Sequence, residues 1–240
     1  MKVNLIKGLV LSVVVGVLAG CNDDDTYTAD VSAINLVNSE VDVYWQFEKG
    51  HEEMSLTDKN GLLFGEKSDE KMLVQDDSDG NVFAFYGVKG NSLETAIEST
   101  RFRFSEHADY VVYTFGRLDN DSAQAAQLGA VKINDDEIAS SKYRVIIFHT
   151  YVADMGKIDI YMGDEKVAEN LEYGDTTNYL DLPIERNELI VVKAGQGANT
   201  QNPIAKATLS PQAGDIQLAY ITSTSENEGN IKSYKVNKAQ

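Results

Sequence analysis

The stretch Val41-Asp42-Val43-Tyr44-Trp45-Gln46-Phe47 alternates between large apolar and more polar side chains. Every second side chain of a β-strand points to the same face, so this alternation predicts a strand with one buried face. Comparable runs follow at 81–88, 101–104, 110–115, 143–149, 157–162, 189–193 and 216–221. Turn-forming pairs such as Asp79-Gly80 and Gly214-Asp215 separate them. Many short strands with almost no helix predict an all-β protein built from antiparallel β-sandwiches.

The chain also resembles itself. Three segments of the first half recur in the same order in the second half: Leu36–Tyr44 as Ile147–Tyr161, Leu63–Glu66 as Leu171–Asp175, and Asp109–Tyr113 as Asp215–Ala219. The separation between the copies changes slowly along the chain, as it would for two domains with loops of unequal length. We therefore expect two tandem sandwich domains at 28–120 and 141–236, joined by a linker at 121–140.

The N-terminus has the composition of a secretory signal peptide, with Lys2 and Lys7 before an apolar run from Gly8 to Leu18. The run is too short to span a bilayer, which takes about 20 apolar residues. Leu18-Ala19-Gly20-Cys21 resembles the bacterial lipobox, in which the cysteine is lipidated and becomes the new N-terminus. Cys21 is also the single cysteine of the sequence. We expect residues 1–20 to be removed and residues 21–27 to form a lipidated tether.

The residues after Cys21 bear on localisation. In enteric bacteria an aspartate next to the lipidated cysteine favours the inner membrane, so Asn22 predicts the outer membrane, with the protein facing the periplasm rather than the cell surface. Asp23–Asp25 fits a solvated tether, and it also resembles acidic surface-export tags. Without the signal peptide the chain has 38 acidic and 19 basic side chains. This excess argues against nucleic-acid partners and against binding flat on anionic lipid.

The segment Arg144–His149, followed by Ile158-Asp159-Ile160-Tyr161, resembles the family catalogued as domain of unknown function 4397. Members open with an apolar strand that ends in His or Asn, then a short loop and Val-Asp-Val-Tyr. Asn170–Gly174 and the strand 189–193 also fit, whereas the loop Thr150–Asp154 differs from the usual Ser-Pro-Asp-Ala type. The resemblance implies immunoglobulin-like sandwiches in cell-envelope proteins, here as two tandem copies, and it implies no activity.

His149 is a candidate metal ligand or general base beside Asp154 or Asp159. The alternative is a histidine that ends a strand and hydrogen-bonds to loop backbone. A lone histidine makes a poor metal site. In the other copy Asn38 stands at the matching place, and Asn keeps the hydrogen bonds but not the proton transfer. We therefore favour the structural role.

Two Asp-x-Tyr pairs, Asp42 with Tyr44 and Asp159 with Tyr161, lie on the polar sides of matching strands. They could form equivalent ligand contacts on the two domains. The alternative, which we favour, is a carboxylate that holds a loop and a tyrosine hydroxyl that caps a turn. The acidic segments 119–121 and 134–137 are interpreted as solvated linker rather than as calcium ligands.

The sequence has no metalloprotease, nucleophile-elbow, P-loop or dinucleotide motif. We predict no catalytic residue, no metal site and no cofactor. The expected function is a non-catalytic binding or spacer module, held to a membrane by the lipid on Cys21, with an envelope protein or glycan as partner. The alternative is an envelope glycan hydrolase with a carboxylate pair, which requires two carboxyl groups about 5–10 Å apart in a deep cleft.

Overall fold

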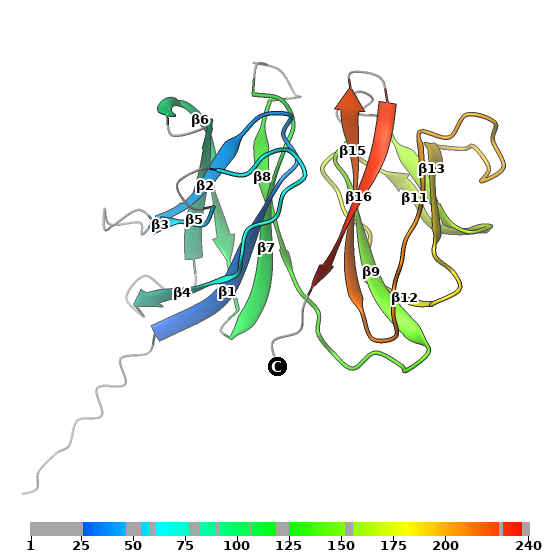
Figure 1. Ribbon diagram of the computed structural model, residues 1–240, viewed down its shortest axis with the longest axis horizontal. Coiled ribbons are helices and arrows are strands. Elements are labelled where there is room, and N and C mark those ends of the chain that lie inside the picture. The colour runs from blue at the N-terminus through cyan, green and yellow to red at the C-terminus, as the bar shows by residue number, and fades with distance from the viewer. Residues whose placement is uncertain are drawn as a thin grey trace, which may run out of the picture.

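The computed structural model describes residues 26–46, 54–57, 61–76, 82–89, 92–105, 107–118, 125–151, 156–225 and 228–236. Over these residues the chain forms sixteen strands and no helix (Figure 1). Within the same ranges, no helix is long and apolar enough to cross a membrane. The all-β, sandwich-type fold class predicted from the alternating runs is confirmed.

The first eight strands form one pair of sheets. They are β1 (Thr26–Asn35), β2 (Val41–Gln46), β3 (Met54–Ser55), β4 (Lys71–Asp76), β5 (Val82–Lys89), β6 (Ser92–Arg103), β7 (Ala108–Phe115) and β8 (Gln127–Lys132). The sheet orders are β3-β2-β5-β6 and β4-β1-β7-β8. Val41, Val43 and Trp45 of β2 face the apolar cluster between these sheets, together with Leu73 and Phe85. The inward face predicted for this strand is therefore confirmed.

The last eight strands form a second pair of sheets. They are β9 (Lys142–His149), β10 (Ile158–Met162), β11 (Glu165–Leu171), β12 (Leu180–Pro183), β13 (Glu188–Lys193), β14 (Ala205–Thr208), β15 (Ile216–Ser225) and β16 (Glu228–Val236). The sheet orders are β11-β10-β13-β14 and β12-β9-β15-β16. Ile158 and Ile160 are buried in the cluster between them, as the sequence predicted.

The two sheet pairs have the same strand order. Each strand of the first pair corresponds to the strand numbered eight higher in the second pair, so that β1 corresponds to β9 and β7 to β15. Most neighbours are antiparallel, but β1 and β7 are parallel, and so are β9 and β15. Figure 1 shows β1 rising from the lower left and β15 pointing upward, with the end of β16 below. The four strands β1, β7, β9 and β15 therefore run in the same general direction.

A third apolar cluster lies between the two sheet pairs, and the sequence analysis did not predict it. Ile34 and Tyr113 meet Ile146, Phe148 and Tyr220 there. The Phe148 and Tyr220 rings stack with centroids 4.2 Å apart, and Tyr113 meets them edge-on at 5.0 and 5.5 Å. The molecule thus has four layers, with the β4-β1-β7-β8 and β12-β9-β15-β16 sheets facing each other in the middle (Figure 1). The central strands of these two sheets, β1, β7, β9 and β15, contribute side chains to an apolar cluster on each face.

The stretch predicted as a linker, 121–140, contains the strand β8, which pairs along β7. Gly129 of β8 lies against the ring of Tyr113, so close that a β-carbon would collide with it. Beyond β8, the Arg144 guanidinium donates to the carbonyl oxygens of Asn134 and Asp136 at 3.0 and 3.2 Å. It also donates two bonds to Asp181, at 2.7 and 2.8 Å. Residues 134–136 are therefore fixed to β9 rather than forming a free solvated linker.

Candidate functional site

His149 ends β9 inside the second sheet pair, where it is fully buried. It lies on the same strand face as Val145 and Ile147, which belong to the core between these sheets. Its Nε2 is 2.9 Å from the carbonyl oxygen of Gly156, and its Nδ1 is 3.4 Å from the backbone nitrogen of Tyr151. A carbonyl only accepts and an amide N–H only donates, so this geometry fits the neutral ring with its proton on Nε2. Both nitrogens are engaged by the backbone of the following loop.

Asn35, not Asn38, takes the place of His149 in the first sheet pair. The backbone N–H of Gly65 donates to the Asn35 carbonyl at 2.7 Å, just as that of Gly174 donates to the His149 carbonyl at 2.8 Å. Asn38 lies exposed in the connection between β1 and β2. The match of Asn38 to His149 was therefore three residues out of register, because this connection is shorter than its counterpart after β9.

The Asn35 side chain makes bonds of the same kind as His149. Its Oδ1 accepts from the N–H of Val37 at 2.9 Å, and its Nδ2 donates to the carbonyls of Ser39 and Leu62 at 2.6 and 2.8 Å. In both sheet pairs the side chain that ends the strand accepts from the residue two positions later and donates to a loop carbonyl. An asparagine does this work in the shorter loop and a histidine in the longer one.

Asp159 is a fully buried carboxylate on the side of β10 that faces away from the core. Lys166 Nζ lies 2.7 Å from Oδ2, the N–H of Gly195 donates to Oδ2 at 3.0 Å, and that of Asn170 donates to Oδ1 at 2.9 Å. Burial alone would raise the pKa of this carboxyl, but the three donors hold it below its ordinary value. Asn170 and Gly195 both have positive φ angles, 55° and 85°. The carboxylate therefore fixes two tight bends of the backbone.

Tyr161 lies on the same face of β10 and holds the same loop. Its hydroxyl donates to the carbonyl of Gln196 at 2.8 Å, one residue after Gly195. Lys166 Nζ lies 5.6 Å from the centre of the Tyr161 ring, within the range of a cation–π contact. Asp159 and Tyr161 thus both tie the loop after β13 to the outer sheet, which matches the structural role favoured for the Asp-x-Tyr pair.

Asp42 stands at the corresponding place on β2 but has a different environment. Its side chain is fully buried, and its Oδ1 accepts from the Thr57 hydroxyl at 3.2 Å. No donor bonds to Oδ2 within the described part of the chain. Burial raises the pKa of Asp42, the Thr57 bond lowers it, and the nearby Glu40 raises it further, so the net direction is upward. Tyr44 is half-buried two residues on.

His149 and Asp159 are not brought together. His149 lies on the core side of β9, whereas Asp159 lies opposite Ile158 and Ile160 on β10 and points away from that core. The backbone of the outer sheet therefore separates the imidazole from the carboxylate. Asp154, the other carboxylate predicted beside His149, and the lipidation site Cys21 both lie outside the described residues.

Three carboxylates that the sequence analysis did not single out converge on the β4-β1-β7-β8 sheet. Asp30 and Asp109 are neighbours on β1 and β7, and Glu70 precedes β4. One carboxylate oxygen from each residue lies within 4.8 Å of the chosen oxygens of the other two. Burial, and then repulsion between them, raises the pKa of Glu70 and of Asp109. Such an all-oxygen set could hold a hard cation such as Ca²⁺. Only the sheet register joins these distant positions, so no local sequence signal exists.

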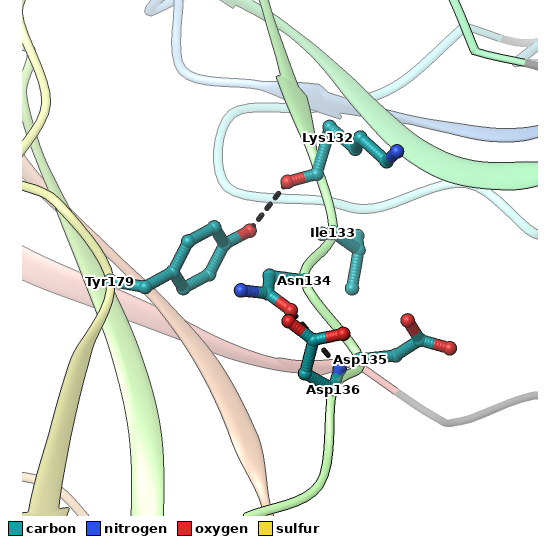
Figure 2. A pocket seen from close by; sticks show the side chains of 6 residues that line it. All are labelled: Lys132, Ile133, Asn134, Asp135, Asp136 and Tyr179. Carbon is teal, nitrogen blue, oxygen red and sulfur yellow. Dashed lines mark hydrogen bonds between the residues drawn. The ribbon is translucent and has the colours of Figure 1, made fainter.

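A pocket of 420 Å³ opens where β8 leads toward β9, lined by Lys132, Ile133, Asn134, Asp135, Asp136 and Tyr179 (Figure 2). The Tyr179 hydroxyl donates to the Lys132 carbonyl at 2.7 Å, which joins the two sheet pairs across the pocket. Figure 2 shows Asp135 and Asp136 on adjacent positions and pointing in different directions. A glycosidase pair must flank the scissile bond. In Figure 2 these two carboxylates do not face each other across the pocket.

A comparison with protein families places the second half of the chain. The family model described as "Domain of unknown function (DUF4397)" matches residues 144–234. Residues 144–234 are a DUF4397 domain. The match starts in β9 and ends in β16, so it takes in all eight strands of the second sheet pair. No curated protein matches the sequence.

The DUF4397 match divides the candidate residues into two groups. His149, Asp159 and Tyr161 lie inside it, and the resemblance predicted from residues 144–161 is confirmed for this half. Asn38, Asp42 and Tyr44 lie outside it. The DUF4397 description assigns no function, so the candidate residues have to be judged by their geometry alone.

Proposed function

We propose that this chain is a lipid-anchored protein of the bacterial cell envelope that acts as a non-catalytic binding or spacer module. The N-terminal sequence supports the anchor, because an apolar run after two lysines leads into Leu18-Ala19-Gly20-Cys21. Asn22 supports the outer membrane, with the fold on the periplasmic side. The partners are the membrane, through the lipid on Cys21, and an envelope protein or glycan.

The observation that carries the non-catalytic role is how the candidate polar atoms are used. A general base or a metal ligand needs an accessible lone pair. The His149 ring nitrogens are engaged by loop backbone, and the Asp159 carboxylate accepts from Lys166 and from two backbone N–H groups. The Tyr161 hydroxyl bonds to a loop carbonyl. These groups hold loops in place instead of facing a substrate.

The two sheet pairs are, in this proposal, tandem copies of one immunoglobulin-like domain of the DUF4397 type. Their identical strand orders and their matching parallel pairs, β1 with β7 and β9 with β15, support this. Asn35 and His149 end equivalent strands, and Asp42 and Asp159 occupy equivalent positions. The first copy has diverged, since it has no counterpart among its described residues to the three donors of Asp159.

The strand directions suggest which end of the molecule meets a partner. β1 begins at Thr26, five residues after Cys21, and ends at Asn35. β9 runs in the same general direction and ends at His149 (Figure 1). The connections that begin after Asn35 and His149 therefore start at the end of the fold far from the tether. A binding partner in the envelope would reach this end first.

Photo-crosslinking in intact cells tests the proposal. A photoreactive amino acid replaces the exposed Asn38, and a matched control replaces the exposed Glu185, which follows β12. We expect membrane-bound protein and capture of an envelope component from position 38 in excess over position 185. A soluble protein, or capture of cytoplasmic proteins alone, would contradict the proposal. Release of sugar from envelope glycan by the purified chain would replace it with a hydrolase.

A further inference from the structure

Two exposed apolar side chains lie beside the point where the tether joins the fold. Over the described residues, the exposed large apolar side chains are Leu63, Met72 and Val74, at 57, 63 and 40% exposure. Met72 and Val74 flank the buried Leu73 on β4, so both point away from the first core. β4 is an edge strand, and it pairs antiparallel with the beginning of β1.

The length of the tether limits the distance between this edge and the membrane. Thr26 comes five residues after Cys21, and a fully extended chain of five residues spans at most about 17 Å. Val74 lies opposite Thr28 and Met72 opposite Asp30. At about 3.3 Å per residue, these two side chains are about 7 and 13 Å along β1 from its start. A bilayer that holds the Cys21 lipid is therefore within reach of both.

Leu63, in the connection between β3 and β4, provides a matched contrast near the far end of β1. Gly65, two residues later, bonds to the carbonyl of Asn35, the last residue of β1. Asn35 is nine residues after Thr26, or about 30 Å along the strand. Leu63 is therefore an exposed apolar side chain of the same sheet pair, about as exposed as Met72, that lies near the end of β1 farthest from the tether.

We propose that Met72 and Val74 contact the lipid surface beside the anchor and hold this sheet edge against it, a contact that we call the seat. The inference rests on the proposed lipidation of Cys21. An apolar edge strand left in solution invites pairing with other chains. A tether of five residues keeps a lipid surface at high effective concentration next to the patch, so two side chains suffice to hold it there.

The charges around the patch select the lipid. Asp30 pairs with Met72 in register, and Glu70 and Asp109 lie beside Asp30. Residues 21–140 have 25 acidic and 9 basic side chains, against 13 and 10 in residues 141–240. Anionic headgroups repel this half of the chain over a screening length of about 8 Å at physiological salt. The seat therefore forms on zwitterionic lipid and weakens on anionic lipid.

Lipid-quenching fluorescence tests the proposal on the full lipidated chain. The lipid occupies the Cys21 thiol, so an introduced cysteine is the sole reactive thiol. Met72→Cys and Val74→Cys, with Leu63→Cys as control, receive an environment-sensitive fluorophore. Each protein is placed on phosphatidylcholine vesicles that contain nitroxide-labelled lipid. We expect several-fold greater quenching at 72 and 74 than at 63, and a smaller difference on vesicles rich in phosphatidylglycerol.

The outcomes separate the seat from the anchor. Equal quenching at the three positions in vesicle-bound protein would overturn the seat and leave the anchor intact. A chain that fails to float with the vesicles would overturn the anchor itself. A fluorescence shift at 72 that appears without vesicles and grows with protein concentration would assign the patch to a second copy of the chain, and it would also overturn the seat.

Discussion

Replacing Asp159 with asparagine removes the charge from a carboxylate that is fully buried and accepts three hydrogen bonds. The amide has one acceptor oxygen, so its NH₂ group must face at least one of the donors Lys166, Asn170 and Gly195. Asp42→Asn is the matched variant on the equivalent strand. There one oxygen accepts a bond from Thr57, and no donor bonds to the other within the described residues. The two substitutions therefore have opposite expected effects.

The magnitudes follow from these partners. Hydrogen bonds to charged groups contribute about 1.5–3 kcal/mol each, and breaking a buried ion pair costs about 3–5 kcal/mol. Lys166 keeps 33% of its side-chain surface exposed and can turn to water, which reduces the loss. We expect Asp159→Asn to lower the free energy of unfolding by about 2–3 kcal/mol at neutral pH. Asp42→Asn should change it by less than about 1 kcal/mol, in the stabilising direction, because it removes an uncompensated buried charge.

The pH dependence has opposite signs at the two positions. The pKa of Asp159 is lowered in the folded state, so its contribution is present above the unfolded pKa and disappears as the pH falls through the folded pKa. The cost of Asp159→Asn should therefore shrink below about pH 4. The pKa of Asp42 is raised, so its ionisation opposes folding above the unfolded pKa. The gain from Asp42→Asn should be present at neutral pH and absent below about pH 4.

Urea unfolding at neutral and acidic pH measures both effects. Trp45 is the single tryptophan and lies in the first core, so its fluorescence reports the sheet pair that contains Asp42. Circular dichroism reports both pairs and so includes the loss at Asp159. Equal destabilisation by the two variants at neutral pH would refute this reasoning. So would a cost of Asp159→Asn that does not change with pH.

Two further variants test the core and the histidine. Ile160→Asp should unfold the second sheet pair, because a buried isoleucine contributes about 1.5–3 kcal/mol and the new carboxylate has no partner in the core. Lys157→Asp, at an exposed position, should cost under about 1 kcal/mol. Circular dichroism and proteolysis distinguish the two variants, and equal stability would contradict the assigned core. His149→Asn should lower the free energy of unfolding by about 1–2 kcal/mol and leave partner capture intact, because Asn35 makes the equivalent bonds in the first sheet pair. A folded variant that no longer captures its partner would make His149 a functional residue.

The sequence predicted β2 and β10, whose two faces differ. Residues 41–46 and 158–162 alternate between core and outer face, and both form strands in which the predicted residues are buried. The predicted runs left out eight strands: β1, β3, β4, β8, β11, β12, β14 and β16. β8 reads Gln-Leu-Gly-Ala-Val-Lys, in which Gly129 makes room for Tyr113 across the sheet, and this contact has no periodic signal.

The cluster between the sheet pairs did leave a signal in the sequence. Residues 110–115 and 145–148 are apolar almost without interruption, and such runs are typical of strands buried on both faces. The prediction used only the strands with alternating side chains, and it therefore gave each sheet a single buried face. The three similar segments follow the same order in the two sheet pairs, but the strand pairings give a register different from the one predicted. Tyr113 lies opposite Ile34 in the first parallel pairing, and Tyr220 lies opposite Phe148 in the second, so Tyr113 and Tyr220 correspond at a separation of 107 residues. The sequence comparison had matched Asp109 with Asp215, at a separation of 106.

Mass spectrometry of the N-terminal peptide of the protein purified from bacterial membranes tests the central claim most directly. The account predicts a mature chain that begins at Cys21, with a diacylglyceryl group on its thiol, and that loses this modification and its membrane association in Cys21→Ala. A chain that keeps residues 1–20, or one that is cut elsewhere and has a free thiol at Cys21, would contradict it.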